Sequence, residues 1–218
     1  MSLTTADGKE CEGLEQGPFE PIAVIGLAAI MPDAENAGQF WQNIIDAKVS
    51  IKQIPEGRWP GPSNHFWRQG GPGAVEEGFT YSKIGALVTG YEFDWRRWRQ
   101  PPGTLPQIDI CQQWAVAVSA DAIEDAGFDG ESKDIDRVRT GVVFANALGG
   151  ENRNMSNIRV WSNHTKQLAS QYGLPDSNMD SFIEDVVKGT PRIDEDTMPG
   201  ELANVVSGRV ANLLDLQG

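Results

Sequence analysis

Two short apolar segments of the chain have the composition of buried β-strands. The first covers Ile22 to Gly26, and the second covers Val138 to Ala145. Both are rich in β-branched residues, and the first runs without polar alternation, which is typical of a strand covered on both faces of its sheet. The pattern therefore predicts two strands, the first of them in the interior of a sheet.

Helical periodicity predicts four helices around these strands. They cover residues 36–47, 109–126, 177–187 and 201–213. Asn36 and Asp109 are the N-cap residues expected for the first two helices. Gly127 ends the second helix and Gly189 ends the third. Strands separated by long helices favour an α/β layered fold.

Each predicted helix has an apolar stripe that should face a core. On the first helix the stripe consists of Phe40, Trp41, Ile44 and Ile45. On the second it consists of Cys111, Trp114, Ala115, Val118, Ala122 and Ala126. On the last it consists of Leu202, Val205, Val206, Val210 and Leu213.

The remaining segments are expected to lack regular structure. Residues 53–106 are irregular but rich in tryptophan, which indicates a packed rather than a floppy loop. Residues 146–150 form a turn, and residues 190–199 form an acidic loop. Residues 1–20 are polar and are expected to be a disordered leader, so that residues 21–218 form the ordered part.

The net charge of −13 changes the set of possible partners. Nucleic acid and anionic membranes need a basic face, so neither is expected as the main partner. The longest apolar run, residues 22–31, is shorter than the roughly 20 residues that cross a bilayer. With only two cysteines, a disulfide framework is excluded, and a reducing cytoplasmic location is the default.

No motif for catalysis within the chain emerges. The turn at Gly26 lacks the G-x-G-x-x-G pattern of dinucleotide-binding proteins, and neither a P-loop nor a G-x-S-x-G elbow occurs. His65 and His164 have no partner at metal-ligand spacing, so no metal site is expected. Cys111 lies on an apolar stripe and is expected to be an inert thiol.

A basic cluster stands out in this acidic chain. Arg96, Arg97 and Arg99 alternate with Trp95 and Trp98. One interpretation is a packed loop whose arginine stems cover apolar surface, and we favour it because such covering is common. The other interpretation is a docking patch for an acidic partner.

Three stretches, in order, resemble the modular β-ketoacyl synthases. They are Glu20 to Pro32 followed by Phe40 to Ile44; Ile108-Asp109 with Gln112 and then Ala122 to Gly127; and Pro199-Gly200 with Ser207 to Gly218. The likeness extends over residues 20–218. The Trp/Arg-rich stretch at 95–99, the Pro101-Pro102 pair and the Gly-Arg-Val-Ala-Asn sequence are most similar to the synthases of polyunsaturated fatty acid and enediyne assembly lines.

The resemblance implies the N-terminal half of a thiolase-like fold, a layered α-β-α arrangement that is incomplete without its second half. It implies decarboxylative Claisen condensation of an acyl thioester with a malonyl unit. The acyl and malonyl groups would arrive on the phosphopantetheine of an acyl carrier protein, and this chain itself would bind no cofactor. A homodimer, or a heterodimer of a synthase with a chain-length factor, is the implied assembly.

The same resemblance places the catalytic residues outside these 218 residues. The family's cysteine would follow Gly218, and its two histidines would lie in the second half. Neither Cys111 nor His164 matches those positions, so no catalytic residue is assigned and the isolated chain is expected to be inactive. A parent protein with another residue in place of the cysteine would be a non-catalytic partner of the chain-length-factor type. A stand-alone binding domain is the third and least favoured hypothesis.

The resemblance also assigns one substrate-binding element. Leu148 matches the family position that lines the end of the acyl pocket, where its side chain would limit chain length. Asn146, Gly149 and Gly150 would shape the same turn. These four residues are the predicted site.

Overall fold

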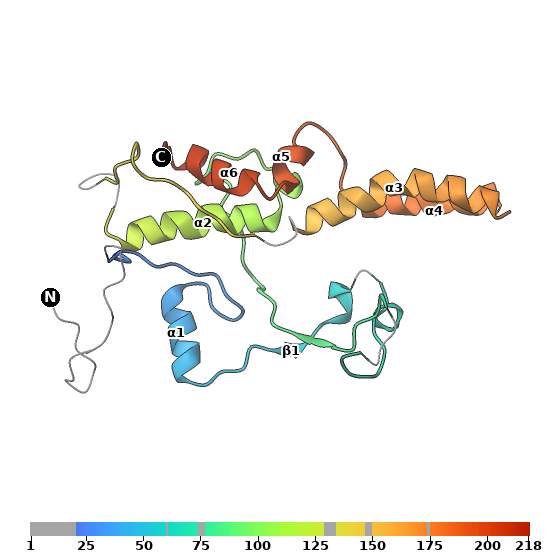
Figure 1. Ribbon diagram of the computed structural model, residues 1–218, viewed down its shortest axis with the longest axis horizontal. Helices are drawn as coiled ribbons and strands as arrows, with labels where there is room; N and C mark the ends of the chain where they lie inside the picture. The colour runs from blue at the N-terminus through green and yellow to red at the C-terminus, as the bar shows by residue number, and fades with distance from the viewer. Residues whose placement is uncertain (1–20, 60, 74–76, 129–133, 147–149, 174) are drawn as a thin grey trace.

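The computed structural model describes residues 21–59, 61–73, 77–128, 134–146, 150–173 and 175–218 (Figure 1). The predicted leader, residues 1–20, lies outside these described residues. The helices in chain order are α1 (Ala37–Ile45), α2 (Ile110–Asp125), α3 (Glu151–Gln171), α4 (Asp176–Gly189), α5 (Thr197–Glu201) and α6 (Val205–Leu213). Three single 3-10 turns are η1 (Glu56–Arg58), η2 (Ser63–His65) and η3 (Leu105–Gln107). The strands are β1 (Lys52–Gln53) and β2 (Ile84–Gly85), which pair antiparallel.

The core lies between α2 and α6, which run side by side (Figure 1). Ala115 and Val116 of α2 meet Val206 and Val210 of α6, and Val116 and Val210 are fully buried. Burying a valine side chain stabilises a fold by about 1.5–3 kcal/mol. This contact therefore fixes α2 and α6 as the base on which the neighbouring elements rest.

The buried face of α2 differs from the predicted stripe. The buried residues of this helix are Gln112, Ala115, Val116, Ala117 and Ala120. Cys111, Trp114 and Val118, which were expected to face inward, are only half-buried. The reason is Gln112. Its side chain forms hydrogen bonds with the Pro199 and Leu202 carbonyl oxygens and with Arg209, so the face of α2 that carries Gln112 packs against α5 and α6.

Helix α1 forms as predicted, with Asn36 as its N-cap. The Asn36 side chain accepts a hydrogen bond from the Gln39 N–H at 2.9 Å, and the Gln39 side chain accepts from the Glu35 N–H at 2.8 Å. The apolar stripe of α1 nevertheless remains largely exposed, since Trp41 is 62% accessible. The local capping signals are thus sufficient to define this helix without burial of its apolar face.

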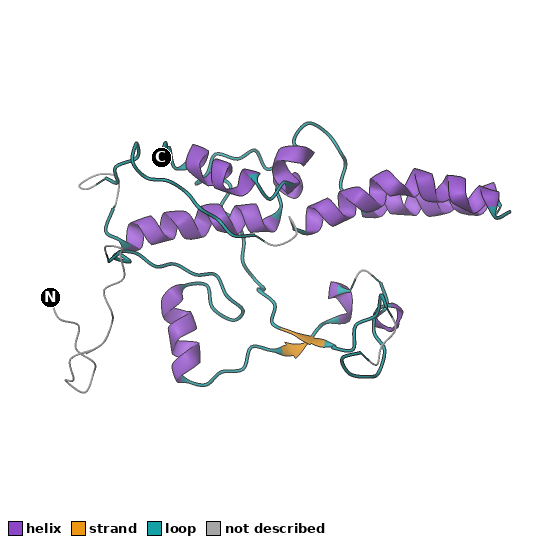
Figure 2. Ribbon diagram, in the orientation of Figure 1, coloured by secondary structure: helices purple, strands orange, loops and turns teal. Residues whose placement is uncertain are grey.

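The two predicted strands do not form, and this expectation was wrong for the described residues. The segments 22–26 and 138–145 have no regular structure, and Val24 and Val143 are 83% and 97% exposed. A strand needs a neighbouring strand for its backbone hydrogen bonds, and neither segment pairs with one in the described parts of the chain. The Thr140 carbonyl oxygen accepts from the Gly218 N–H at 3.1 Å, but residues 217 and 218 are not part of a strand. The regular sheet of these parts consists of β1 and β2 alone (Figure 2).

Helices α3 and α4 form a hairpin that extends away from α2 and α6 (Figure 1). The 21-residue α3 was not predicted, whereas α4 matches the predicted helix at 177–187 to within two residues at its end. The buried residues of α3 are Ser156 and Ser162, so this helix presents polar side chains to its neighbours and lacks the apolar period of a core helix. Arg159 donates to the Val187, Thr190 and Pro191 carbonyl oxygens at 3.0–3.1 Å and so closes the end of α4.

The predicted last helix at 201–213 is divided into α5 and α6, and α5 begins inside the predicted acidic loop. The backbone of Gly200 in α5 lies directly against Gln107 of η3, where a Cβ would overlap the Gln107 carbonyl oxygen. Only glycine fits this contact.

In the described residues, no helix has the length and apolarity needed to span a membrane.

The contact at Gly200 predicts opposite effects for two glycine substitutions. Gly200→Ala should lower the free energy of unfolding by more than about 2 kcal/mol, because the backbone of Gln107 must move. Gly208→Ala is the matched control: it lies in α6 with open space around it and should raise the free energy of unfolding by about 0.5–1 kcal/mol. Urea unfolding followed by tryptophan fluorescence measures both, and equal effects would contradict the close approach.

Candidate functional site

Two of the four predicted site residues lie in the described parts of the chain. Asn146 is exposed, and its side-chain amide donates to the Cys111 sulfur at 3.5 Å. Gly150 precedes α3 and lies against Asp109. Leu148 and Gly149 lie outside the described residues. The structure thus places both flanks of the predicted pocket turn next to the first turn of α2.

Asp109 is the centre of this arrangement. Its side chain is almost fully buried, and one carboxyl oxygen accepts from the Cys111 N–H at 2.9 Å while the other accepts from the Asn152 N–H at 3.0 Å. Its own N–H donates to the Gly200 carbonyl oxygen at 2.8 Å. Each helix N-terminus leaves backbone N–H groups without partners inside the helix, and an aspartate accepts from them well. One side chain therefore joins the starts of α2 and α3, and its backbone adds α5.

Gly150 is glycine for two independent reasons. Its φ of 95° lies in the left-handed region that residues with a Cβ rarely adopt. A Cβ at this position would also overlap the Asp109 carboxyl group. The backbone of Gly150 can therefore approach the buried Asp109 carboxyl group this closely only because glycine has no side chain.

A second layer of polar contacts holds α5 and α6 against α2. The Gln112 side chain is 1% exposed; its amide donates to the Pro199 and Leu202 carbonyl oxygens at 3.1 and 3.3 Å, and its oxygen accepts from Arg209 Nε at 2.6 Å. Burial lowers the pKa of Arg209, and the nearby charge of Asp196 opposes that effect. Gln112 thus adds hydrogen bonds to two backbone carbonyl oxygens at the break between α5 and α6.

Cys111 lies between Asp109 and Asn146 and is half-buried. Burial raises the pKa of its thiol to about 11, and the hydrogen bond to the Asp109 carboxyl group adds to the shift. A thiol with this pKa stays protonated at neutral pH and is a poor nucleophile. The geometry agrees with the prediction of an inert cysteine, although it sits beside the predicted site rather than on a plain apolar stripe.

The basic cluster has the contacts of a packed loop. Arg97 pairs with Asp121 and Glu124 of α2, at 3.4 and 2.6 Å, and lies over the ring of Trp98. Arg96 lies 4.4 Å above the ring of Trp95. Since the Arg97 guanidinium is engaged by two carboxylates of α2, the structure favours the packed-loop interpretation at this residue.

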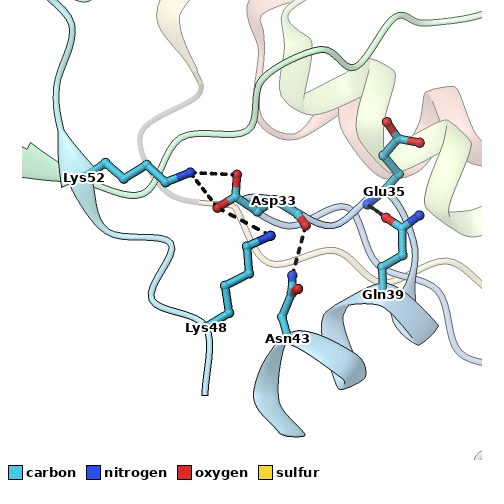
Figure 3. Close-up of polar contacts among 6 residues, drawn as sticks. All are labelled: Asp33, Glu35, Gln39, Asn43, Lys48 and Lys52. Carbon is cyan, nitrogen blue, oxygen red and sulfur yellow. Dashed lines mark hydrogen bonds and ion pairs between the residues drawn. The ribbon is translucent and has the colours of Figure 1, made fainter. Parts of the chain in front are cut away.

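A further polar cluster surrounds Asp33 (Figure 3). Its carboxylate accepts from Lys52 at 2.8 and 3.1 Å, and Lys48 lies 3.9 Å away. Its carbonyl oxygen accepts from the Asn43 amide at 2.9 Å. The hydrogen bond from Lys52 lowers the pKa of Asp33. The cluster joins the turn before α1 to α1 itself and to β1, so its contacts account for a structural role.

Neither histidine takes part in these clusters. His164 makes an edge-to-face contact with Trp161 on α3, with ring centres 5.5 Å apart, and His65 lies beside Phe66. Among the described residues, no group of three potential metal ligands occurs.

The sequence alone missed the roles of Asp109 and Gln112 in joining segments, because each was interpreted only as part of the start of a helix.

Comparison with known proteins identifies the family. The profile of the beta-ketoacyl synthase N-terminal domain matches residues 19–218. A polyunsaturated fatty acid synthase component from Thraustochytrium sp. is 26% identical over 199 residues, which are 90% of this chain and 7% of that protein. The polyketide synthase ThaG of Burkholderia thailandensis is 36% identical over 135 residues, or 61% of this chain and 2% of that protein.

Solved structures show the same fold. The oxazolomycin ketosynthase domain OzmH KS7 of Streptomyces albus has a TM-score of 0.60 and 21% identity, covering 89% of this chain and 27% of that one. A beta-ketoacyl synthase from Burkholderia phymatum has a TM-score of 0.53 and 14% identity, covering 89% of this chain and 37% of that one. The predicted fold class is therefore confirmed as part of a thiolase-like fold. The chain spans a small fraction of the curated relatives, and it belongs to the beta-ketoacyl synthase family as a member of its N-terminal domain.

Proposed function

We propose that the protein carrying this chain is a ketosynthase that extends an acyl group by decarboxylative Claisen condensation. The observation that supports the proposal most is the family match over residues 19–218, together with a shared fold over 89% of the chain. In this reaction a malonyl thioester loses CO₂, and the resulting carbanion attacks the carbonyl carbon of an acyl–cysteine thioester. The cysteine leaves as a thiolate, and a β-ketoacyl thioester is formed.

This chain would contribute the framework and one wall of the acyl pocket rather than the nucleophile. Asn146 and Gly150 flank the turn assigned to the pocket, and both rest on the first turn of α2. Cys111 contacts the first of these flanks but keeps its proton. The reacting cysteine and the histidines that stabilise the developing negative charges would come from residues beyond those of this chain.

The partners belong to the same proposal. An acyl carrier protein would deliver both the acyl and the malonyl group on its phosphopantetheine arm, and this chain would hold no cofactor of its own. The complete ketosynthase would work as a homodimer in the cytoplasm. The relatives, a polyunsaturated fatty acid synthase and polyketide synthases, support carrier-bound acyl substrates for this protein as well.

A non-catalytic partner of the chain-length-factor type is the alternative. Its N-terminal half would share the same fold and the same pocket turn. The two functions differ at the position of the nucleophile, and neither Asp109 nor Gln112 distinguishes them. An assay that follows both the condensation product and the acylation of a cysteine gives different results for a ketosynthase and for a chain-length factor.

The environment of Cys111 predicts a slow reaction with alkylating agents. In a Cys11→Ser variant of the 218-residue chain, Cys111 is the remaining thiol. At pH 8 its thiolate population should be on the order of two hundred times smaller than that of a free thiol with a pKa near 8.5. The rate of iodoacetamide alkylation should rise up to about pH 11, where the pKa of this thiol lies. A midpoint near pH 8.5 in the folded chain would contradict this environment, and unfolding in guanidinium should restore that ordinary value.

The condensing function predicts two products in one experiment. The full-length parent protein is incubated with an acyl thioester and malonyl-loaded carrier protein, and mass spectrometry follows the β-ketoacyl product and the acylated peptide. We expect both, with the acyl group on a cysteine other than Cys111. Formation of neither an acyl-cysteine nor a condensation product, with decarboxylation retained, would support the chain-length-factor type instead. Acylation of Cys111 would overturn the assignment of the nucleophile.

A further inference from the structure

We propose that the outward face of α3 is an interaction surface, which pairs in an antiparallel arrangement with the same face of a second copy of this chain. The face is formed by a stripe that consists of Ile158, Trp161, Thr165, Leu168 and Tyr172. The homodimer named under the proposed function has no surface assigned to it. The pairing rests on side chains of the α3–α4 hairpin, and it holds whether or not the protein condenses acyl groups.

The members of this stripe recur at alternating steps of three and four residues. Such steps keep side chains on one side of a helix, and two helices that pack along a shared seam use the same spacing. At 1.5 Å per residue, the stripe covers about 21 Å of α3 and of Tyr172, which directly follows the helix. One side of α3 therefore has the pattern of a helix that packs against another helix.

The stripe is not the side of α3 that the hairpin buries. Helix α4 lies alongside α3, and the buried side chains of α3 are serines (Figure 1). Trp161 is 61% exposed and Tyr172 is 85% exposed, while Ile158 and Leu168 are also classed among the exposed apolar residues. The apolar stripe thus lies on a surface that no described element of the chain covers.

The same face lacks charged residues, although the chain has a net charge of −13. Among the exposed residues of 154–173, all of which the structure describes, none is Asp, Glu, Lys or Arg. The two charged side chains of this range are half-buried: Arg159 donates to carbonyl oxygens at the end of α4, and Lys166 pairs with Asp180. Because a helix that faces only water usually has a charged outward side, the uncharged face indicates a partner.

Helix α4 provides the contrast within the same hairpin. Its exposed side chains include Asp180, Glu184, Asp185 and Lys188, as expected for a helix whose outward side meets water. The lack of charge is therefore a property of the α3 face and not of the hairpin as a whole.

A second copy of the chain fits this face better than a charged partner does. Two uncharged apolar faces meet without desolvating a charge and without bringing like charges together. Away from this face, two chains with a net charge of −13 repel each other. The hairpin extends away from α2 and α6, so antiparallel pairing keeps the two acidic bodies at opposite ends of the contact (Figure 1). Both the surface and the orientation therefore favour self-association.

An antiparallel pair centred near Thr165 brings large apolar side chains together. Trp161 of each copy then lies beside Leu168 of the other, and Ile158 lies beside Tyr172. The exposed parts of these four side chains, counted in both copies, amount to on the order of 1,000 Å², which is near the lower end of specific interfaces. We therefore expect a reversible dimer with a Kd in the micromolar range.

The experiment measures the dimer Kd of the 218-residue chain under reducing conditions by sedimentation equilibrium. Trp161→Glu and Leu168→Lys each place a charge in the seam, and a double variant carries both changes. Trp41→Glu is the matched control, because Trp41 of α1 is 62% exposed, as Trp161 is to within one per cent, but lies outside the stripe. Far-UV circular dichroism verifies that each variant keeps its helices.

For each single variant of the stripe, we expect the Kd to rise at least about tenfold, because a charge loses its water in the seam without gaining a partner. The double variant should recover most of the affinity, because an antiparallel pair brings the new glutamate of one copy beside the new lysine of the other. Added salt should weaken the dimer of the double variant but not that of the wild type. Trp41→Glu should leave the Kd unchanged.

Three results would overturn the inference. A wild-type chain that stays monomeric at several hundred micromolar would exclude the pairing. Equal weakening by Trp41→Glu would show that association follows from exposed apolar surface in general. A double variant that keeps its helices but recovers no affinity would exclude the antiparallel arrangement, and a mixture of the two single variants tests the same contact if the double variant loses its helices. Condensation of acyl groups enters none of these results, so the proposed function stands or fails separately.

Discussion

A buried carboxyl group must have hydrogen-bond partners for its oxygens, and much of this structure is arranged around how Asp109 meets that requirement. The partners are backbone N–H groups at the starts of α2 and α3. Both helix N-termini carry partial positive charge, which favours the acidic side chain between them. Two helices that begin about forty residues apart therefore meet at one residue.

The same principle governs the layer beneath Asp109. Gln112 occupies one of the most buried positions of α2, where a simple apolar stripe would place a hydrophobic residue. It binds two carbonyl oxygens of the α5–α6 region together with Arg209. Polar contacts with fixed geometry specify how α5 lies on α2, while Val116 and Val210 supply the apolar burial. On α2, orientation is thus provided by Gln112 and apolar burial by Val116.

Local signals in the sequence were sufficient to predict the elements that depend on nearby residues. Asn36 and Asp109 cap the helices that they were expected to cap. The strands at 22–26 and 138–145 could not be predicted correctly from composition, since a strand depends on a neighbour that these described residues do not provide. Helix α3 was missed because its buried side chains are serines, so no apolar period marks its packed face. In the candidate site, Asn146 and Gly150 came from the family resemblance, and their pocket role stays a prediction. The bonds from Asn152 and Asn146 to the start of α2 involve no local pattern that a single sequence could reveal.

The contacts that hold the α3–α4 hairpin together determine how its stability depends on temperature. Its buried side chains are Ser156 and Ser162, and Arg159 closes one end through backbone carbonyls. Among its described residues, the apolar side chains are half-buried or exposed. Heat-capacity changes on unfolding arise mainly from exposing apolar surface. Separation of α3 from α4 should therefore have a small heat-capacity change, and the stability of the hairpin should vary with temperature much more evenly than that of the valine core between α2 and α6.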